Sequence, residues 1–122
     1  MRLQLRDQEP VRRICRTRFC DNRVFVYEEV CLPAELFPKV ENEDSYRIVV
    51  LAQQHGLLLG ESQERVSIGA ASREAAEALD IVKGSPLLVV DRVVHTIRRQ
   101  PAEWRLSQCR LSASYYLVHI CR

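Results

Sequence analysis

The sequence predicts an α+β fold with a single antiparallel β-sheet and flanking helices. Apolar and β-branched residues recur in runs of strand length, and short turns separate most of these runs. Strands joined by short turns pair antiparallel, and two short helices cannot cover both faces of a large sheet. The expected order is strand, strand, helix, strand, helix, strand, strand, strand. A chain of 122 residues is the size of one domain, which we expect to span residues 1–122.

The first two strands are expected to form a hairpin. Residues 11–20 alternate with a period of two, Asp21–Asn22–Arg23 interrupts the pattern, and residues 24–31 resume it. A short Asp-Asn turn between two such runs is typical of a β-hairpin. Prolines at both ends of residues 33–38 then allow one short helical turn and nothing longer.

Two segments carry helix signals. The first is expected over residues 43–54, with Asp44 or Ser45 as the N-cap and a stop at residues 55–56. The second is expected over residues 72–79, where Ser72 supplies the cap and Glu74 lies near the positive end. The remaining strands are expected at residues 57–70, 86–96, 102–111 and 115–121.

Charge and hydropathy exclude several classes. The net charge of +2 is too small for a surface that contacts many phosphates, so this segment is not expected to bind DNA itself. The longest apolar runs have only the length of a strand, and charges interrupt the beginning of the chain before an apolar stretch develops. We therefore expect no membrane partner and a cytoplasmic protein.

The five cysteines do not indicate a metal site or a disulfide framework. Their number is odd and no CxxC pair occurs, so we expect reduced thiols packed as small apolar groups. Cys109, His119 and Cys121 match no zinc-ligand spacing. We expect neither a metal nor a cofactor.

Several segments together carry a family resemblance. They are LRDQEPVRRICRTR at residues 5–18, VYEEVCLPAELFP at residues 26–38, ALDIVKGSPLL at residues 78–88, Arg92, and PAE at residues 101–103. In this order and spacing they resemble the UTRA domain, the effector-binding half of the HutC branch of GntR-type transcription regulators. The resemblance extends from about residue 3 to about residue 116.

The resemblance implies a fold like that of chorismate lyase, in which helices lie over a curved antiparallel sheet and a ligand pocket lies between them. Full regulators of the family carry an N-terminal winged helix-turn-helix domain, which we expect to be absent from residues 1–122. The match begins within the sensing domain, without its first helix and strand.

Arg16 and Arg18 are the main candidate ligand-binding residues. They lie two positions apart on a predicted strand, so both side chains project from the same face. Two guanidinium groups there can donate paired hydrogen bonds to a carboxylate or phosphate. Ile14 and Cys20 on the same face suggest that the pocket around the arginines has apolar walls that exclude water. The resemblance implies that this pair binds the anionic effector; the alternative is a solvated strand face. We expect Arg16→Ala to cost about 2–5 kcal/mol of ligand affinity and little folding stability.

Three further candidates come from the resemblance. It implies that Glu28 and Glu103 meet ligand hydroxyls or hold the arginines in place, and that Ser45 helps to bind the anion. Cross-strand salt bridges are the alternative for the glutamates, and a plain N-cap is the alternative for Ser45.

Two positions depart from the sugar-phosphate sensors of the family. Those proteins tend to carry an arginine where this chain has Gly60–Glu61, and a tyrosine near the position of Cys109. Loss of a cation and a phenol favours a mono-anionic organic acid over a doubly charged sugar phosphate as the effector.

The sequence therefore predicts an effector-binding domain, not an enzyme. It would bind a small anionic metabolite, form a homodimer, and control DNA binding through an attached winged helix-turn-helix domain. Two alternatives stay open: a chorismate lyase-like enzyme on the same fold, and a dimerisation module that has lost its ligand.

Overall fold

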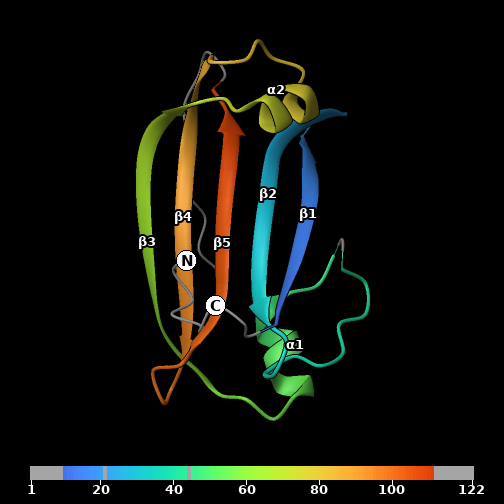
Figure 1. Ribbon diagram of the computed structural model, residues 1–122, viewed down its shortest axis with the longest axis vertical. Coiled ribbons are helices and arrows are strands. Elements are labelled where there is room, and N and C mark those ends of the chain that lie inside the picture. Colours follow the sequence, from blue (N-terminus) through green and yellow to red (C-terminus); the bar gives the residue numbers. More distant parts are fainter. Residues whose placement is uncertain (1–9, 21, 44, 112–122) are drawn as a thin grey trace.

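The computed structural model describes residues 10–20, 22–43 and 45–111 and contains one five-stranded sheet and two helices (Figure 1). This confirms the predicted α+β class. The strand expected at residues 115–121 lies outside the described residues. In chain order the elements are β1 (Val11–Cys20), β2 (Arg23–Pro33), α1 (Ile48–Gln54), β3 (Leu59–Ala70), α2 (Arg73–Leu79), β4 (Pro86–Thr96) and β5 (Pro101–Arg110).

The sheet has the order β1-β2-β5-β4-β3, and every neighbouring pair is antiparallel. β1 and β2 form a hairpin at one edge. The chain then crosses through α1 to the opposite edge, where β3 begins, and returns through β4 to β5 beside β2 (Figure 1). The neighbouring strands β2 and β5, which carry Glu28 and Glu103, thus come from an early and a late part of the sequence.

The two hairpin turns use left-handed backbone. Asn22 between β1 and β2 has φ 64°, a conformation that asparagine tolerates better than most residues. Arg99 between β4 and β5 has φ 65°, and the Thr96 amide closes this turn by donating to the Gln100 carbonyl at 2.8 Å. The predicted hairpin of β1 and β2 is confirmed, and β4 and β5 form a second hairpin.

Helix α2 follows its sequence signals. The Ser72 hydroxyl accepts a hydrogen bond from the Ala75 amide at 3.2 Å, and Glu74 lies in the first turn. The helix ends where Asp80 turns left-handed, with φ 55°. The prediction that Ser72 caps this helix is confirmed.

Helix α1 begins later than predicted. Its first residue is Ile48, and its N-cap is Arg47, which makes no side-chain capping bond. The prediction of a helix from residue 43 with Asp44 or Ser45 as its cap was wrong. The chain turns first at Asn42, with φ 56°, and Tyr46 is then drawn into the core, so tertiary packing overrides the local capping signal.

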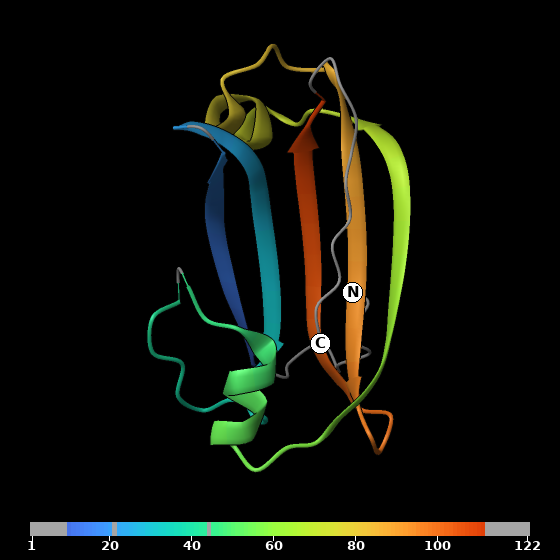
Figure 2. The same cartoon turned by 180° about the vertical axis from the view of Figure 1, so that it is seen from behind.

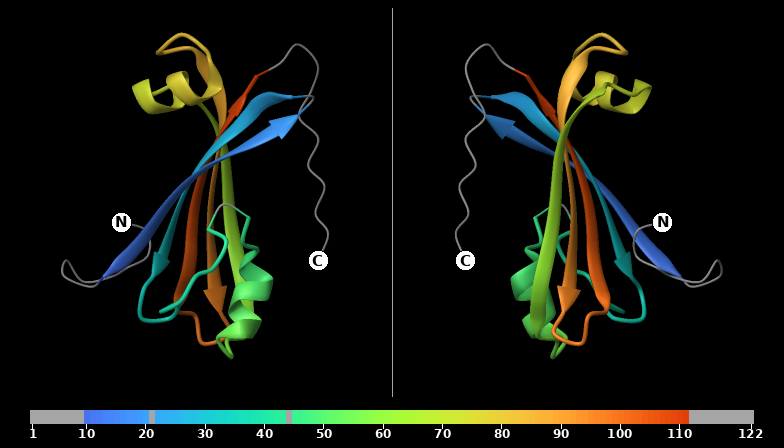
Figure 3. Two further views of the ribbon diagram at one scale, coloured as in Figure 1. Left: turned by 90° about the vertical axis from the view of Figure 1, so that its right-hand side faces the viewer. Right: turned by 90° about the vertical axis from the view of Figure 1, so that its left-hand side faces the viewer.

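The two helices lie on opposite faces of the sheet and at opposite ends of it (Figure 3). In Figure 2 α1 lies in front of the sheet, near the end of β2. Leu51 of α1 packs with Ile14 and Val30, whereas Leu79 of α2 packs with Leu87 on the other face. Neither helix is long and apolar enough to cross a membrane, and the described residues contain no other helix.

The face that α1 covers has a polar middle between two apolar sectors. The sector at α1 is built on Ile14, Val30 and Leu32, and the sector at the far end on Leu88, Val90 and Cys109. Between them the strand register brings charged residues of four strands together. This charged region is the candidate site.

Candidate functional site

One carboxylate holds two of the four arginines of β1, Arg16 and Arg18. Glu28 Oε2 accepts from Arg16 Nε at 2.8 Å, and Glu28 Oε1 accepts from Arg18 Nε at 3.0 Å. Both guanidinium groups therefore lie on the face of the sheet that α1 covers. Their surroundings differ, because the Arg16 side chain is 2% exposed and that of Arg18 is 55% exposed.

Arg16 is held from three directions. Besides the bond to Glu28, its Nη1 donates to the Tyr46 carbonyl at 3.1 Å, and its guanidinium carbon lies 4.5 Å from the centre of the Tyr46 ring. Its Nη2 is buried and has no hydrogen-bond partner. A buried donor without a partner is costly and is rare in folded proteins, so this nitrogen marks a place where a ligand oxygen can bind.

Glu103 organises the other half of the charged region. Its side chain is completely buried and accepts three hydrogen bonds: from the Tyr46 hydroxyl at 2.6 Å, Arg92 Nη2 at 2.9 Å and Arg105 Nη2 at 3.1 Å. Tyr46 therefore touches both Arg16 and Glu103 and joins the two halves. We call the six residues Arg16, Arg18, Glu28, Arg92, Glu103 and Arg105 the arginine cluster.

Sequence reasoning missed three functional candidates. Arg105 follows Glu103 by two positions and so shares its strand face, a signal that could have been used. Arg92 faces Arg105 across the β4–β5 pair, and Tyr46 lies on the loop before α1. Those two placements depend on strand register and loop packing, which no local pattern reveals.

Both glutamates of the cluster stay ionised. Burial opposes the charge of Glu28, but the positive charges of Arg105, Arg16 and Arg18 outweigh it and lower the pKa of Glu28. Burial likewise opposes the charge of Glu103, while Arg105, the Tyr46 hydroxyl and Arg92 lower its pKa below the ordinary value. The cluster thus contains four positive and two negative side chains, and the excess positive charge favours an anion.

The neutral groups nearby stay protonated. Burial, reinforced by the charge of Glu103, raises the pKa of Tyr46 well above its usual range. Burial and the charge of Glu28 raise the pKa of the Cys109 thiol to about 11. A protonated thiol is a poor nucleophile and a poor metal ligand. Among residues 10–20, 22–43 and 45–111, no three His, Cys, Asp or Glu side chains gather as a metal site would require.

Ser45 lies outside this network. It is exposed, precedes α1 by three residues, and its amide donates to the Asn42 carbonyl at 2.9 Å. Within the described part of the chain, no hydrogen bond joins its hydroxyl to the arginine cluster. The structure therefore brings Arg16, Arg18, Glu28 and Glu103 together and leaves Ser45 beside them, next to Tyr46.

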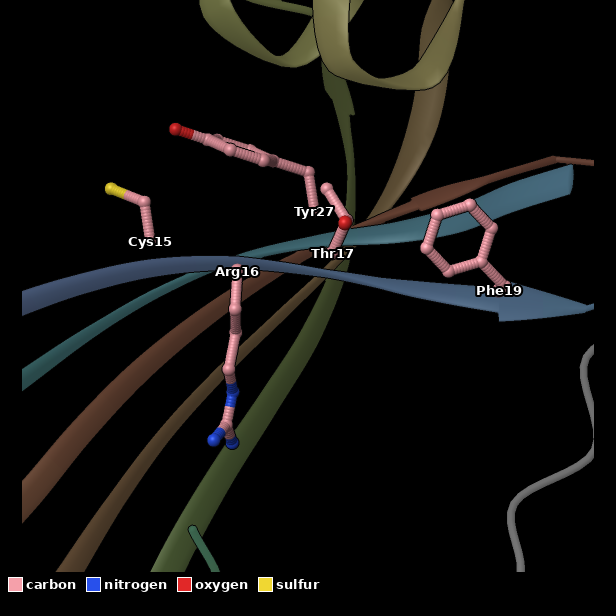
Figure 4. Close-up of a pocket in the computed structure, with 5 residues that line it drawn as sticks. All are labelled: Cys15, Arg16, Thr17, Phe19 and Tyr27. Atoms are coloured by element: carbon pink, nitrogen blue, oxygen red, sulfur yellow. The ribbon is translucent and has the colours of Figure 1, made fainter. Parts of the chain in front are cut away.

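A separate hollow of about 380 Å³ lies on the other side of β1. Cys15, Arg16, Thr17, Phe19 and Tyr27 line it. Figure 4 shows the Arg16 side chain pointing away from the other four, so its guanidinium belongs to the arginine cluster instead. Burial raises the pKa of Tyr27, with a contribution from Cys15, so the walls of the hollow carry a neutral phenol, a thiol, a phenyl ring and a small hydroxyl. The hollow lacks the charged groups that would select an anion.

The fold is that of effector-binding domains of transcription regulators. The effector-binding domain of the trehalose repressor of Bacillus subtilis matches over 98% of this chain and 85% of its own, with a TM-score of 0.81 and 16% identity. A GntR-family regulator from Enterococcus faecalis matches over 97% and 86%, with a TM-score of 0.82 and 25% identity. The ligand-binding domain of a putative GntR-family regulator from Bordetella bronchiseptica matches over 98% and 79%, with a TM-score of 0.81 and 26% identity.

The sequence itself matches the family model of the UTRA domain over residues 1–114, and the chain belongs to that family. It spans 54% of the possible regulator YydK of Bacillus subtilis, which it matches with a TM-score of 0.82 and 22% identity over 97% of its own length. A search of the curated proteins gives no match. The predicted family is thereby confirmed.

Proposed function

We propose that this domain binds a small anionic metabolite at the arginine cluster. The observation that carries the proposal is the pairing of Arg16, whose Nη2 is buried without a partner, with Arg18, whose side chain is 55% exposed. A ligand anion that reaches Arg18 from solvent can satisfy the Arg16 donor as well. Guanidinium groups suit this role because their donors match the planar oxygens of a carboxylate.

Glu28 and Glu103 serve in this proposal as positioning residues. Each carboxylate already accepts hydrogen bonds at both of its oxygens, so each holds guanidinium groups in place. Ser45, on the exposed loop before α1, is proposed as a further contact for the anion. Because the glutamates are engaged, ligand hydroxyls find few free acceptors, which favours an organic acid over a sugar phosphate.

Signal transmission follows from the position of Tyr46. This residue leads into α1, and Arg16 and Glu103 hold its two ends. A ligand that accepts a hydrogen bond from Arg16 changes the contacts of Tyr46 and thereby favours one arrangement of α1 over another. In the full regulator this bias would control DNA binding by an attached winged helix-turn-helix domain of the HutC type.

We further propose that the protein acts as a cytoplasmic homodimer, since twofold operators are read by twofold proteins. Light scattering on the chain of 14.1 kDa should then give about twice the monomer mass. A monomer at high concentration would contradict this part of the proposal.

A lyase on the same fold is the main rival. Such an enzyme would need an acid to protonate a leaving group or a base to remove a proton. The carboxyl groups of the cluster are ionised and saturated with arginine donors, and the pKa of Tyr46 is raised, so none of these groups is poised to exchange a proton near neutral pH. The charge state and bonding of the cluster thus favour binding over turnover.

A thermal-shift screen of organic acids and sugar phosphates tests the proposal. A ligand at 100 times its dissociation constant stabilises the folded state by about 2.7 kcal/mol, which raises the melting temperature by several degrees. We expect at least one organic acid to do so and uncharged sugars to have no effect. Stabilisation by uncharged sugars alone, with none by any acid, would contradict an anion site.

A further inference from the structure

We propose that Arg92 and Arg105 form a second anion-binding subsite beside Arg16 and Arg18, and that the effector is a small dicarboxylate. This inference rests on the proposed function and deepens it. It replaces the mono-anionic acid favoured by the sequence with a dianion.

The strand register places the second pair next to the first. Arg92 on β4 and Arg105 on β5 are paired directly, and Arg105 pairs with Val30 on its other side. Two residues along β2 from Val30, Glu28 pairs with Arg16 on β1 and with Ser107 on β5. All four arginines therefore lie on the same face of the sheet. Arg92 and Arg105 share one row of paired residues, Arg16 lies in the next row, and Arg18 lies one row further.

The second pair has unused donors. Each of the two guanidinium groups donates one Nη2 bond to Glu103, while the Nε of Arg92 and the Nε of Arg105 are buried and have no partner. Their side chains as a whole are 27% and 14% exposed, although the two Nε atoms themselves are buried. Together with Arg16 Nη2, three buried guanidinium nitrogens of the arginine cluster lack an acceptor. The missing acceptors are what a second carboxylate would supply.

The acceptors of the cluster, by contrast, are occupied. Glu28 accepts from Arg16 and Arg18, and the Ser107 hydroxyl lies 3.5 Å from Glu28 Oε1. Glu103 accepts from three donors. A ligand rich in hydroxyl groups needs free acceptors, whereas a ligand rich in carboxylate oxygens needs free donors. Because the free groups of the cluster are donors, the cluster favours a ligand rich in carboxylate oxygens.

The net charge of the cluster also favours a dianion. The positive side chains exceed the negative ones by two, which a dianion neutralises and a mono-anion does not. Arg92 and Arg105 supply positive charge from strands other than β1. Leu88, Val90 and Cys109 beside the cluster can contact a carbon skeleton.

The test compares dicarboxylates with their own monoamides. Malonate, succinate, glutarate, adipate and phthalate, each paired with its monoamide, are titrated calorimetrically into the 122-residue chain. A monoamide keeps the skeleton and one carboxylate and removes one charge. We expect at least one dicarboxylate to bind about tenfold or more tightly than its monoamide, since a charge-assisted hydrogen bond contributes about that factor.

Variants assign the difference to the second subsite. Arg92→Gln should bring the dicarboxylate down towards the affinity of its monoamide and weaken the monoamide far less than the dicarboxylate. Arg105→Lys, which keeps the charge at a more buried position, should reduce the preference partly. Arg98→Gln, in the exposed turn between β4 and β5, removes one positive charge away from the cluster and should change neither affinity.

The outcomes separate this inference from the proposed function. If every monoamide binds as tightly as its dicarboxylate, or if Arg92→Gln leaves the preference intact, the second subsite is wrong. If Arg18→Gln nevertheless weakens binding in the same titrations, the proposed anion site stands. If no dicarboxylate binds while a sugar phosphate from the thermal screen does, the dicarboxylate class is overturned and the anion site is retained.

Discussion

Arg16 and Glu28 form a buried ion pair between neighbouring strands. Their atoms Nε and Oε2 lie 2.8 Å apart, and the two side chains are only 2% and 5% exposed. A pair taken out of water in this way adds little net stability when both partners are present, but loss of one partner leaves a buried charge uncompensated. The residues that we propose to bind the ligand therefore also contribute to the stability of the fold.

Arg16→Ala should destabilise the fold strongly, contrary to the expectation from sequence of a mild effect. Glu28 would keep Arg18 and lose its buried partner, and we expect the free energy of unfolding to fall by about 3 kcal/mol. The measurement is urea denaturation followed by Trp104 fluorescence. Arg18→Ala is the matched control, because the Arg18 side chain is largely solvated and should cost under about 1 kcal/mol. Equal losses for the two variants would show that Arg16 is not a buried partner.

Glu103→Gln should also destabilise the fold. The amide keeps the size of the side chain but removes the negative charge that two arginines share, and its NH2 group cannot accept from them. We expect a loss of about 2–4 kcal/mol in the same denaturation experiment. Glu61→Gln on the exposed edge strand β3 serves as the control and should stay within about 0.5 kcal/mol of the parent. A stable Glu103→Gln variant would contradict the role of Glu103 as the organising carboxylate.

Stability should fall in acid. The folded pKa of Glu28 and that of Glu103 lie below the ordinary value of 4.5, so the unfolded chain binds protons more readily than the folded one. The stabilisation is therefore complete above pH 4.5 and is lost as the pH falls through the lower folded values. Denaturation at a series of pH values from 7 downward measures this. Glu103→Gln should show a shallower loss below pH 4.5, and a slope equal to that of the parent would count against a lowered pKa of Glu103.

Ser72→Ala and Ser45→Ala should differ, although both serines were expected to cap helices. The Ser72 hydroxyl accepts from the Ala75 amide, and its removal should cost about 1 kcal/mol of stability. Ser45 precedes α1 by three residues and caps nothing, so its removal should leave the free energy of unfolding within about 0.5 kcal/mol. Thermal denaturation of the two variants distinguishes them. A larger loss for Ser45→Ala would restore the longer α1 predicted from sequence.

The sequence predicted those parts of the fold that local chemistry determines. Asn22 marked the first hairpin, Ser72 began α2, and the spacing of Arg16 and Arg18 correctly placed both on one strand face. The prediction failed where contacts between residues far apart in the chain determine the structure. Burial of Tyr46 delays the start of α1.

The other half of the candidate site could not be predicted for the same reason. Arg92 and Arg105 lie on the same sheet face as Arg16 because β5 inserts between β2 and β4, so that β2 pairs with a strand far from it in the chain. Nothing in the local sequence around either arginine encodes that register.

Calorimetric titration of Arg18→Gln with the acid that stabilises the parent most tests the central claim directly. Arg18 is exposed enough to be replaced without unfolding the chain, and it presents the anion with the donors nearest to solvent. We expect a loss of affinity of about tenfold or more in Arg18→Gln and parent-like affinity in the Arg98→Gln control. Unchanged affinity in a folded Arg18→Gln variant would contradict the claim that the effector binds at the arginine cluster.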